Sequence, residues 1–309
     1  MMRILIASPI DPGAISQLRG HYDVVCAFDA TTDELQSAIQ DRELLVFRSG
    51  VSITAEVMEC APELRYLIRA GSGLDNVDVD YVRRRGLELV RIPTPSAQAV
   101  AEMSFAFMLA ASRRLFEADR SMRERRWAKY ELYGRLLSGK VLGIVGAGNT
   151  GSRVGELGAM LGMEVLGCVE HPSPEREAAL AEKGIRLTDC DEVISKSDYV
   201  SVHVPVKEST WHMFDAGVLA RMKPGSFLVN LGRGGVVDEE ALVEALTRGD
   251  TLSGAALDVH EVEAEGHLSP LVALPNVILT PHIGATVVDT QREIGRRVRE
   301  YVERFAATE

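Results

Sequence analysis

The chain has 309 residues, a length that suggests two domains, and its 46% hydrophobic and 26% charged residues are typical of a soluble globular protein. A formal net charge of −11 disfavours nucleic-acid binding through the overall field, and the longest apolar runs are too short to span a membrane. The first apolar run ends at Pro9, which is too short for a secretory signal. We therefore predict a cytoplasmic protein that binds neither nucleic acid nor a membrane.

The first third of the chain alternates strand and helix patterns. A capping-box sequence, Thr31-x-x-Glu34, opens one helix, and a second is expected over about 55–60. Apolar runs predict strands at 2–7, 44–47, 64–70 and 87–92. This alternation implies parallel strands joined by crossover helices, so this part of the chain is expected to form one α/β lobe.

Pro93 and Pro95 end that pattern. Residues 97–120 are apolar at helical spacing and predict one long helix, which could join two lobes or pack against a second subunit. Residues 121–137, with Trp127 and Tyr133, are expected to form a charged and aromatic connector.

A second lobe is expected from residue 141 onward. Its predicted strands are 141–145, 163–169, 199–204, 226–231, 254–259 and 277–280, and its predicted helices are 152–161, 175–183, 215–222 and 239–247. An amphipathic helix over 286–305 follows. The fold class is therefore α/β, with a doubly wound parallel sheet in the second lobe.

Residues 141–151, VLGIVGAGNTG, lie between a predicted strand and a predicted helix. Gly146, Gly148 and Gly151 have the G-x-G-x-x-G spacing, which permits a tight turn, close approach of a pyrophosphate and close packing of helix on strand. The N–H groups at the start of the helix then face the anion. The alternative is an ordinary glycine-rich turn, but a strand before and a helix after favour a dinucleotide site.

Chemically useful side chains follow three later strands, at the end where open parallel sheets bind ligands. Arg233 stands between glycines and suits a carboxylate, because its guanidinium is a planar, permanently charged fork. His282 is a candidate proton donor. A carboxylate beside it would hold one tautomer; Glu261 and Glu263 are both available, and spacing does not choose between them.

The four cysteines, Cys26, Cys60, Cys168 and Cys190, show no C-x-x-C pair. This spacing predicts neither a disulfide framework nor a metal site, and it favours small buried thiols in a reducing compartment.

Six stretches in order carry a family resemblance: RAGSGLDNVD (69–78), the glycine loop, VHVPVKEST (202–210), MKPGSFLVNLGRGGVVDEEAL (222–242), GAALDVHEVE (254–263) and LTPHIGAT (279–286). Through them the chain resembles the D-isomer-specific 2-hydroxyacid dehydrogenases over nearly its whole length. The resemblance implies that Arg233, Glu263 (rather than Glu261) and His282 are catalytic. It implies substrate contacts from Arg48 and from Ser72 and Gly73 in the 71–73 turn.

The resemblance also implies where a dinucleotide binds. Besides the three glycines, the implied contacts are Asn149, Thr150, His203, Val204, Pro205 and Thr210, with Asp258 at the nicotinamide end. A smaller flavodoxin-like substrate lobe would comprise 1–96 plus 287–309, and a Rossmann-like dinucleotide-binding lobe 97–286. The implied assembly is a homodimer, with the 97–120 helix and the connector at its interface, and no metal is implied.

In the implied reaction, reduced nicotinamide gives a hydride to the carbonyl carbon of a 2-oxo acid. Arg233 holds the carboxylate and polarises the carbonyl, His282 protonates the developing alkoxide, and Glu263 supports the charge on His282. In the oxidative direction His282 is the base.

Two departures from the family pattern concern the cofactor and the catalytic loop. The usual acidic residue that reads the adenosine ribose is replaced by Val169, and Glu170 follows it. A carboxylate there would repel a 2′-phosphate, and no Arg or Lys lies between Val169 and Glu175, so NAD is favoured over NADP. His260 replaces a common aromatic residue in the segment that carries Glu263.

We therefore predict an oxidoreductase that transfers a hydride between NAD(H) and a small D-2-hydroxy acid or 2-oxo acid. Two alternatives keep the scaffold: a non-catalytic NAD(H)-sensing protein, and a dehydrogenase of a small oxyanion such as formate or phosphite.

Overall fold

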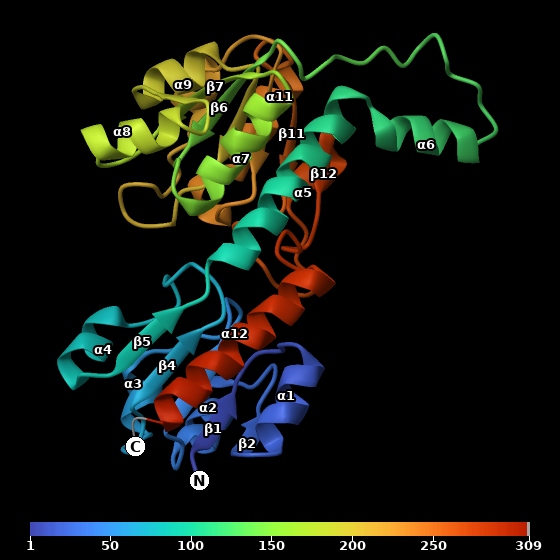
Figure 1. Cartoon of the computed structure of the whole chain (residues 1–309). Helices are drawn as coiled ribbons and strands as arrows, with labels where there is room; N and C mark the ends of the chain where they lie inside the picture. The colour runs from blue at the N-terminus through green and yellow to red at the C-terminus, as the bar shows by residue number, and fades with distance from the viewer. Residues whose placement is uncertain (308–309) are drawn as a thin grey trace. The chain divides into compact units, whose positions relative to one another are not determined.

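The computed structural model describes residues 1–307 and shows two compact units, Met1–Ser96 with the described segment from Thr286 onward, and Ala97–Ala285 (Figure 1). We call them unit 1 and unit 2. Each contains one parallel sheet with helices on both faces, so the predicted α/β class is confirmed.

Unit 1 has a five-stranded parallel sheet in the order β2-β1-β3-β4-β5, the flavodoxin-like order. Its strands are β1 (Arg3–Ile6), β2 (Asp23–Cys26), β3 (Leu44–Phe47), β4 (Tyr66–Arg69) and β5 (Glu88–Arg91). The three inner strands are almost entirely buried, as apolar runs require when both faces are covered.

The helices of unit 1 pack on the two faces of this sheet. One face is covered by α1 (Pro12–Arg19) and by the C-terminal helix α12 (Val288–Ala306), and the other by α2 (Thr32–Ile39), α3 (Ala55–Glu59) and α4 (Val79–Arg85). The predicted capping box is confirmed, because Thr31 N donates to Glu34 Oε2 (2.8 Å) and Glu34 N donates to Thr31 Oγ1 (3.4 Å). In Figure 1 the red α12 lies beside the blue α1, so the two ends of the chain build one core.

Unit 2 has a seven-stranded parallel sheet in the order β12-β11-β10-β9-β6-β7-β8. Its strands are β6 (Val141–Val145), β7 (Glu164–Cys168), β8 (Ile185–Leu187), β9 (Tyr199–Val202), β10 (Ser226–Asn230), β11 (Leu252–Leu257) and β12 (Val277–Leu279). The order reverses between β6 and β9, and ligands bind at such a switch point in doubly wound sheets.

The helices of unit 2 also pack on both faces. Residues of α5 (Thr94–Ser112), α7 (Asn149–Met160) and α8 (Pro174–Ala181) form one core, and residues of α9 (Cys190–Lys196), α10 (Ala216–Arg221) and α11 (Glu239–Arg248) form the other. Within residues 1–307, no helix combines the length and apolar character needed to cross a bilayer.

The single long helix predicted over 97–120 is wrong. Two helices replace it, α5 and α6 (Leu115–Arg123), and the chain between them includes Arg114 in a left-handed conformation with φ 50°. The Ser112 carbonyl, which a continuous helix would use internally, accepts instead from Arg135 N (2.9 Å). Gly134 permits this approach, because a Cβ there would lie 2.7 Å from the same oxygen. This break depends on a segment twenty residues away, and no Gly or Pro marks it locally.

Besides α6 and two 3₁₀ turns, the sequence did not predict five short helices and strands, namely α1, β2, α4, β8 and α9. Each has eight residues or fewer, so periodicity is weak, and several are recognisable only from their caps. Strand β9 also ends at Val202 rather than at the predicted residue 204.

Candidate functional site

The glycine loop joins β6 to α7 and forms a cradle for an anion. Gly146 has φ 92°, and a Cβ there would lie 2.9 Å from the His203 backbone, while a Cβ on Gly151 would lie 2.3 Å from the Gly146 carbonyl. A Cβ on Gly148, by contrast, would meet no atom within 4 Å, so this residue faces open space. No side chain caps the N-terminus of α7, which leaves its first amides available to a phosphate. The residues present therefore fit the pyrophosphate of a dinucleotide.

Asn149 and Thr150 form the first turn of α7, and the acidic residue expected near the adenosine follows β7. Glu170 is exposed and pairs with Lys207, whose ammonium donates to Oε1. This hydrogen bond holds the pKa of Glu170 below its usual value. Lys207 comes from the segment after β9, far outside residues 169–175, so no pattern near Glu170 in the sequence predicts it.

The segment 203–210, after β9, is braced by its own side chains. Thr210 Oγ1 donates to the Pro205 carbonyl (2.6 Å) and accepts from Lys207 N (2.9 Å). His203 begins this segment, and burial of its ring lowers its pKa to about 4, so the ring is neutral at pH 7. Its Nε2 lies 2.8 Å from Ser201 Oγ, and its buried Nδ1 has no partner within residues 1–307. Val204 packs over Gly146, where a Cβ would lie 2.7 Å from Val204 Cγ1.

Arg233 stands in the turn between β10 and the short 3₁₀ helix η1 (Gly234–Val236). Asn230, fully buried, holds this turn from within: Nδ2 donates to the Arg233 carbonyl (2.9 Å), and Oδ1 accepts from Gly232 N (3.0 Å). Arg233 Nη1 donates to the Gly232 carbonyl (2.8 Å). The guanidinium is thus anchored to a rigid turn at the carboxyl end of the strand.

The Arg233 turn lies directly against the segment that follows β11. A Cβ on Gly234 would lie 1.8 Å from the His260 carbonyl oxygen, so only glycine permits this backbone approach. A Cβ on Gly235 would lie 2.2 Å from the Trp211 ring. The spacing between Arg233 and the 260–263 segment is therefore fixed by backbone contact.

Glu263 and His282 form a close pair, with Glu263 Oε2 2.7 Å from His282 Nδ1. Glu261 points elsewhere: its Oε1 accepts from Glu239 N (3.0 Å). Burial raises the pKa of Glu263, but the hydrogen bond with His282 and the charge of that ring outweigh it and hold the pKa below its usual value. The structure therefore pairs His282 with Glu263 rather than with Glu261.

Asp258, 2% exposed at the end of β11, holds the turn that carries His282. Its carboxylate accepts from Ile283 N (2.8 Å), from Gly284 N (2.7 Å) and from Thr280 Oγ1. Its backbone carbonyl accepts from His282 N (2.8 Å), and His282 adopts φ 54°. Asp258 was predicted to contact the nicotinamide end of a cofactor. In the structure its carboxylate is hydrogen-bonded to the turn that carries His282.

Sequence reasoning missed a buried polar network behind this pair. Glu239, 4% exposed, accepts from Glu261 N (2.9 Å) and from Ser269 Oγ, and its Oε1 lies 3.8 Å from His260 Nδ1. His260 Nε2 lies 3.0 Å from the Thr280 carbonyl, and His260 N donates to Glu263 Oε1 (3.3 Å). His260 thus contacts Glu263 directly, and it contacts the strand end that leads to His282 through the Thr280 carbonyl. The only local signal was its replacement of an aromatic residue.

The substrate residues predicted in unit 1 lie at the carboxyl ends of β3 and β4. Arg48 N donates to Ser8 Oγ (2.9 Å), and Asn76 Nδ2 donates to the Arg48 carbonyl (3.0 Å). Burial lowers the pKa of Arg48. The turn containing Ser72 and Gly73 is held by the buried Arg69, whose Nε donates to the Gly73 carbonyl (2.8 Å). Arg69 was not predicted as a site residue.

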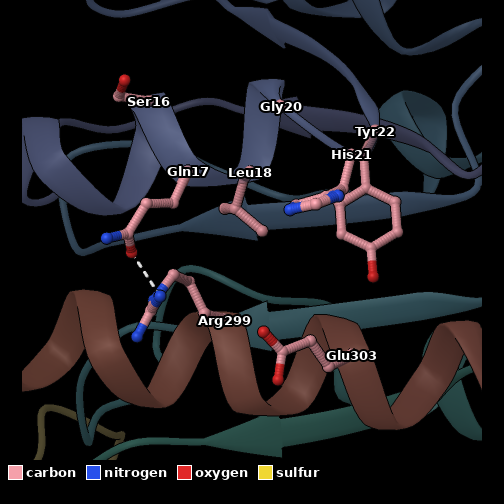
Figure 2. A pocket seen from close by; sticks show the side chains of 8 residues that line it. All are labelled: Ser16, Gln17, Leu18, Gly20, His21, Tyr22, Arg299 and Glu303. Carbon is pink, nitrogen blue, oxygen red and sulfur yellow. Dashed lines mark hydrogen bonds between the residues drawn. The ribbon is translucent and has the colours of Figure 1, made fainter.

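A cavity of about 480 Å³ lies elsewhere on unit 1, between α1 and α12. Figure 2 shows Gln17 hydrogen-bonded to Arg299 across it, with His21, Tyr22 and Glu303 around the opening. None of the predicted site residues lines it, so it is separate from the candidate site.

The chain is similar to a known protein family and to several known proteins. The family model described as "D-isomer specific 2-hydroxyacid dehydrogenase, NAD binding domain" matches residues 105–284, more than half of the chain. D-3-phosphoglycerate dehydrogenase of Mycobacterium tuberculosis is 38% identical over 306 residues, which are 99% of this chain but 57% of that protein. The chain thus spans little more than half the length of this relative.

Two further relatives match from end to end. Hydroxypyruvate reductase of Thermotoga maritima is 36% identical over 303 residues, 97% of each chain. The crystal structure of D-lactate dehydrogenase from Aquifex aeolicus, complexed with NAD and lactic acid, has a TM-score of 0.85 and 28% identity, covering 99% of this chain and 96% of that one.

The His260–Glu239 contact predicts a pH-dependent stability. The Glu239 carboxylate is the main cause of the raised pKa of His260, with the Thr280 carbonyl and Glu263 adding to it against the effect of burial. Because the folded pKa is raised, the stabilisation is fully present below the unfolded value of about 6.5 and is lost as pH rises through the folded value. His260→Phe should therefore reduce the free energy of unfolding more at about pH 6 than at about pH 9, measured by urea denaturation.

Glu239→Gln provides the matched background. There, the pH dependence of the His260→Phe effect should shrink, because the charge that raises the pKa is gone. An effect of His260→Phe that is equal at both pH values in the wild-type background would contradict the prediction.

Proposed function

Because the chain belongs to the D-isomer specific 2-hydroxyacid dehydrogenase family, we propose that it transfers a hydride between NAD(H) and a small D-2-hydroxy acid or 2-oxo acid. The observation that carries the proposal is the 2.7 Å contact between His282 and Glu263, held by backbone packing next to the Arg233 turn. Reduction of a 2-oxo acid requires a cation that binds the substrate carboxylate and a proton donor, and an arginine and a histidine hydrogen-bonded to a carboxylate can fill these two roles.

In the proposed reaction Arg233 binds the substrate carboxylate. Its planar guanidinium can donate two parallel hydrogen bonds, and it polarises the adjacent carbonyl. The buried Asn230 keeps the Arg233 turn rigid, so the charge is in place before the substrate arrives. Within unit 1, Arg48 and the 72–73 turn are the residues that we propose for substrate contacts.

His282 donates the proton. Its Nδ1 faces Glu263, so the Nε2 end is the one free to reach the substrate oxygen. The low pKa of Glu263 keeps that carboxylate ionised near neutrality, where it faces His282 Nδ1. Asp258 contributes by holding the left-handed turn at His282.

The glycine loop and the start of α7 would hold the pyrophosphate, and the 203–210 segment would lie beside the adenosine. When bound, the nicotinamide supplies or accepts the hydride. We propose that residues 97–286 form the dinucleotide-binding domain and that 1–96 with 287–309 form the substrate domain. A cytoplasmic location fits the free thiols of the chain.

The first test is oxidation of NADH by the full chain with a panel of 2-oxo acids: glyoxylate, hydroxypyruvate, pyruvate and 3-phosphohydroxypyruvate. The wild-type protein should turn over at least one of them. Arg233→Ala should lower kcat/KM by about 10²–10³-fold or more, because a charge-assisted contact to the reacting acid is lost. NADH affinity, measured by fluorescence titration, should stay within about threefold, because Arg233 is assigned to the acid.

Arg233→Lys serves as the control. Its kcat/KM should lie between those of the wild type and Arg233→Ala, because a compact ammonium charge replaces the planar guanidinium. If NADH bound but no panel acid reacted, a nucleotide-sensing protein or a dehydrogenase of an oxyanion such as formate or phosphite would replace the proposal. Loss of NADH binding in Arg233→Ala would refute the assigned role.

We further propose a preference for NAD over NADP, supported by the Glu170 carboxylate after β7. Lys207 weakens this preference, because its ammonium group pairs with the Glu170 carboxylate. Glu170→Ala would remove the ribose contact and leave Lys207 free to meet a 2′-phosphate. The ratio of kcat/KM for NADPH to that for NADH should therefore rise about tenfold or more.

The matched variants are Lys207→Gln and the double variant. Lys207→Gln should not raise the ratio, and the double variant should lose most of the gain in NADPH use. An unchanged ratio in Glu170→Ala would show that Glu170 does not reach the adenosine ribose.

We also propose a homodimer. Helix α6 and the following connector extend away from the sheet of unit 2 (Figure 1) and carry a concentration of large exposed apolar residues: Leu115, Phe116, Met122, Trp127, Tyr130, Tyr133 and Leu136. Exposed apolar groups at this density are typical of an association surface. Sedimentation should give twice the 33.7 kDa of one chain.

Phe116→Asp combined with Trp127→Asp should shift this protein to the monomer, because each change places a charge in the apolar surface. Met160→Asp, at an equally exposed apolar residue of α7, is the control and should leave the mass unchanged. A monomeric wild-type protein would contradict the proposal.

A further inference from the structure

Two of the four cysteines lie against each other beside the glycine loop. Cys168 Sγ and Cys190 Sγ are 2.8 Å apart, although 22 positions separate them in the chain. Both are free thiols, and a disulfide bond would bring the sulfur atoms to about 2.05 Å. The pair therefore needs to close by less than about 1 Å to form a bond.

The two thiols differ in exposure, which gives each a distinct part in an oxidation. Cys168 ends β7 and is 6% exposed, whereas Cys190 begins α9 and is half-buried. The hydrogen bond between them lowers the pKa of Cys168 and raises that of Cys190, so Cys190 must release its proton to solvent before its sulfur can act as a nucleophile. Cys190 is the thiol that an external reagent can reach, and Cys168 is placed to displace that reagent from it.

We propose that Cys168 and Cys190 form a redox modification site, a dithiol that a small-molecule disulfide such as oxidised glutathione converts to an intrachain disulfide. In the first step Cys190 releases its proton to solvent, its thiolate attacks the reagent, an S–S bond forms between them, and one glutathione leaves as its thiolate. In the second step the Cys168 sulfur attacks the Cys190 sulfur and the second glutathione leaves. Two protein thiols are oxidised, one reagent disulfide is reduced, and the two protein protons pass to the glutathione thiolates.

The geometry indicates that the disulfide would leave the conformation of the glycine loop intact. The Cys168 carbonyl accepts from Gly146 N (3.1 Å) and Ala147 N (3.0 Å), so the β7 end is part of the glycine loop's backbone support. A sub-ångström movement of two sulfur atoms leaves these backbone bonds in place. The bond would fix the start of α9 to the end of β7 and close a loop that contains α8 and β8.

The test equilibrates the reduced full chain with graded ratios of oxidised to reduced glutathione, traps free thiols with an alkylating reagent, and maps non-reduced peptides by mass. The expected product loses two alkylation sites and contains one cross-linked peptide pair, with Cys168 and Cys190 joined. Its thermal midpoint should exceed that of the reduced protein by roughly 5–10 °C, because the bond constrains the unfolded chain. NADH affinity should change by less than about threefold.

Cys60→Ser is the matched control, a half-buried thiol of unit 1, and it should oxidise like the wild type. Cys190→Ser should form no intrachain disulfide at Cys168. Full alkylation of both cysteines at the highest oxidant ratio, or arrest at a glutathione adduct on Cys190, would overturn the proposal. Loss of NADH binding on oxidation would overturn the inference that the disulfide leaves the glycine loop intact.

This inference rests on the proposed function only through the NADH measurement. If the reduced protein failed to bind NADH, the proposed function would fail, while the peptide map would still decide the disulfide.

Discussion

The candidate catalytic site depends on one buried carboxylate. Asp258 binds the backbone N–H groups of Ile283 and Gly284 and the hydroxyl of Thr280, and through them it holds His282 at φ 54°. A left-handed histidine is unfavourable in isolation, so the surrounding contacts must supply the energy that keeps it there. Hydrogen bonds from N–H groups to a charged acceptor each contribute about 1.5–3 kcal/mol, enough to fix such a turn. The imidazole is thereby placed before any substrate binds.

A second constraint joins this turn to the arginine. Gly234 lies against the His260 carbonyl, and His260 in turn contacts the Thr280 carbonyl and the Glu263 carboxylate. Three strand ends, those of β10, β11 and β12, are therefore held together by backbone packing and one half-buried imidazole. Glu239 supplies the counter-charge behind them and keeps the Glu261 N–H satisfied. A buried charge of this kind is tolerated because the Glu261 N–H and the Ser269 hydroxyl both donate to it.

The sequence was most informative where the relevant contacts are local. The glycine spacing predicted the β6–α7 turn, and the capping box predicted the start of α2, because each depends on residues within a few positions. The strand ends also brought Arg233, Glu263 and His282 to one edge of one sheet, as parallel topology requires. Contacts between distant segments were not predictable: the Ser112–Arg135 bond that ends α5, the Asn230 brace and the Glu239 network all join residues that no local pattern connects.

The Glu170–Lys207 pair shows what this limitation means for function. Read along the chain, Glu170 stands alone and argues against a 2′-phosphate; in the fold, a lysine from beyond β9 neutralises part of its charge. Cofactor preference then depends on the balance of two opposite charges rather than on the presence of one. Both side chains are substantially exposed, so their mutual attraction is weak and a bound ribose can compete for either. Preference at this site is thus a property of the pair, and a change at one member alters what the other can bind.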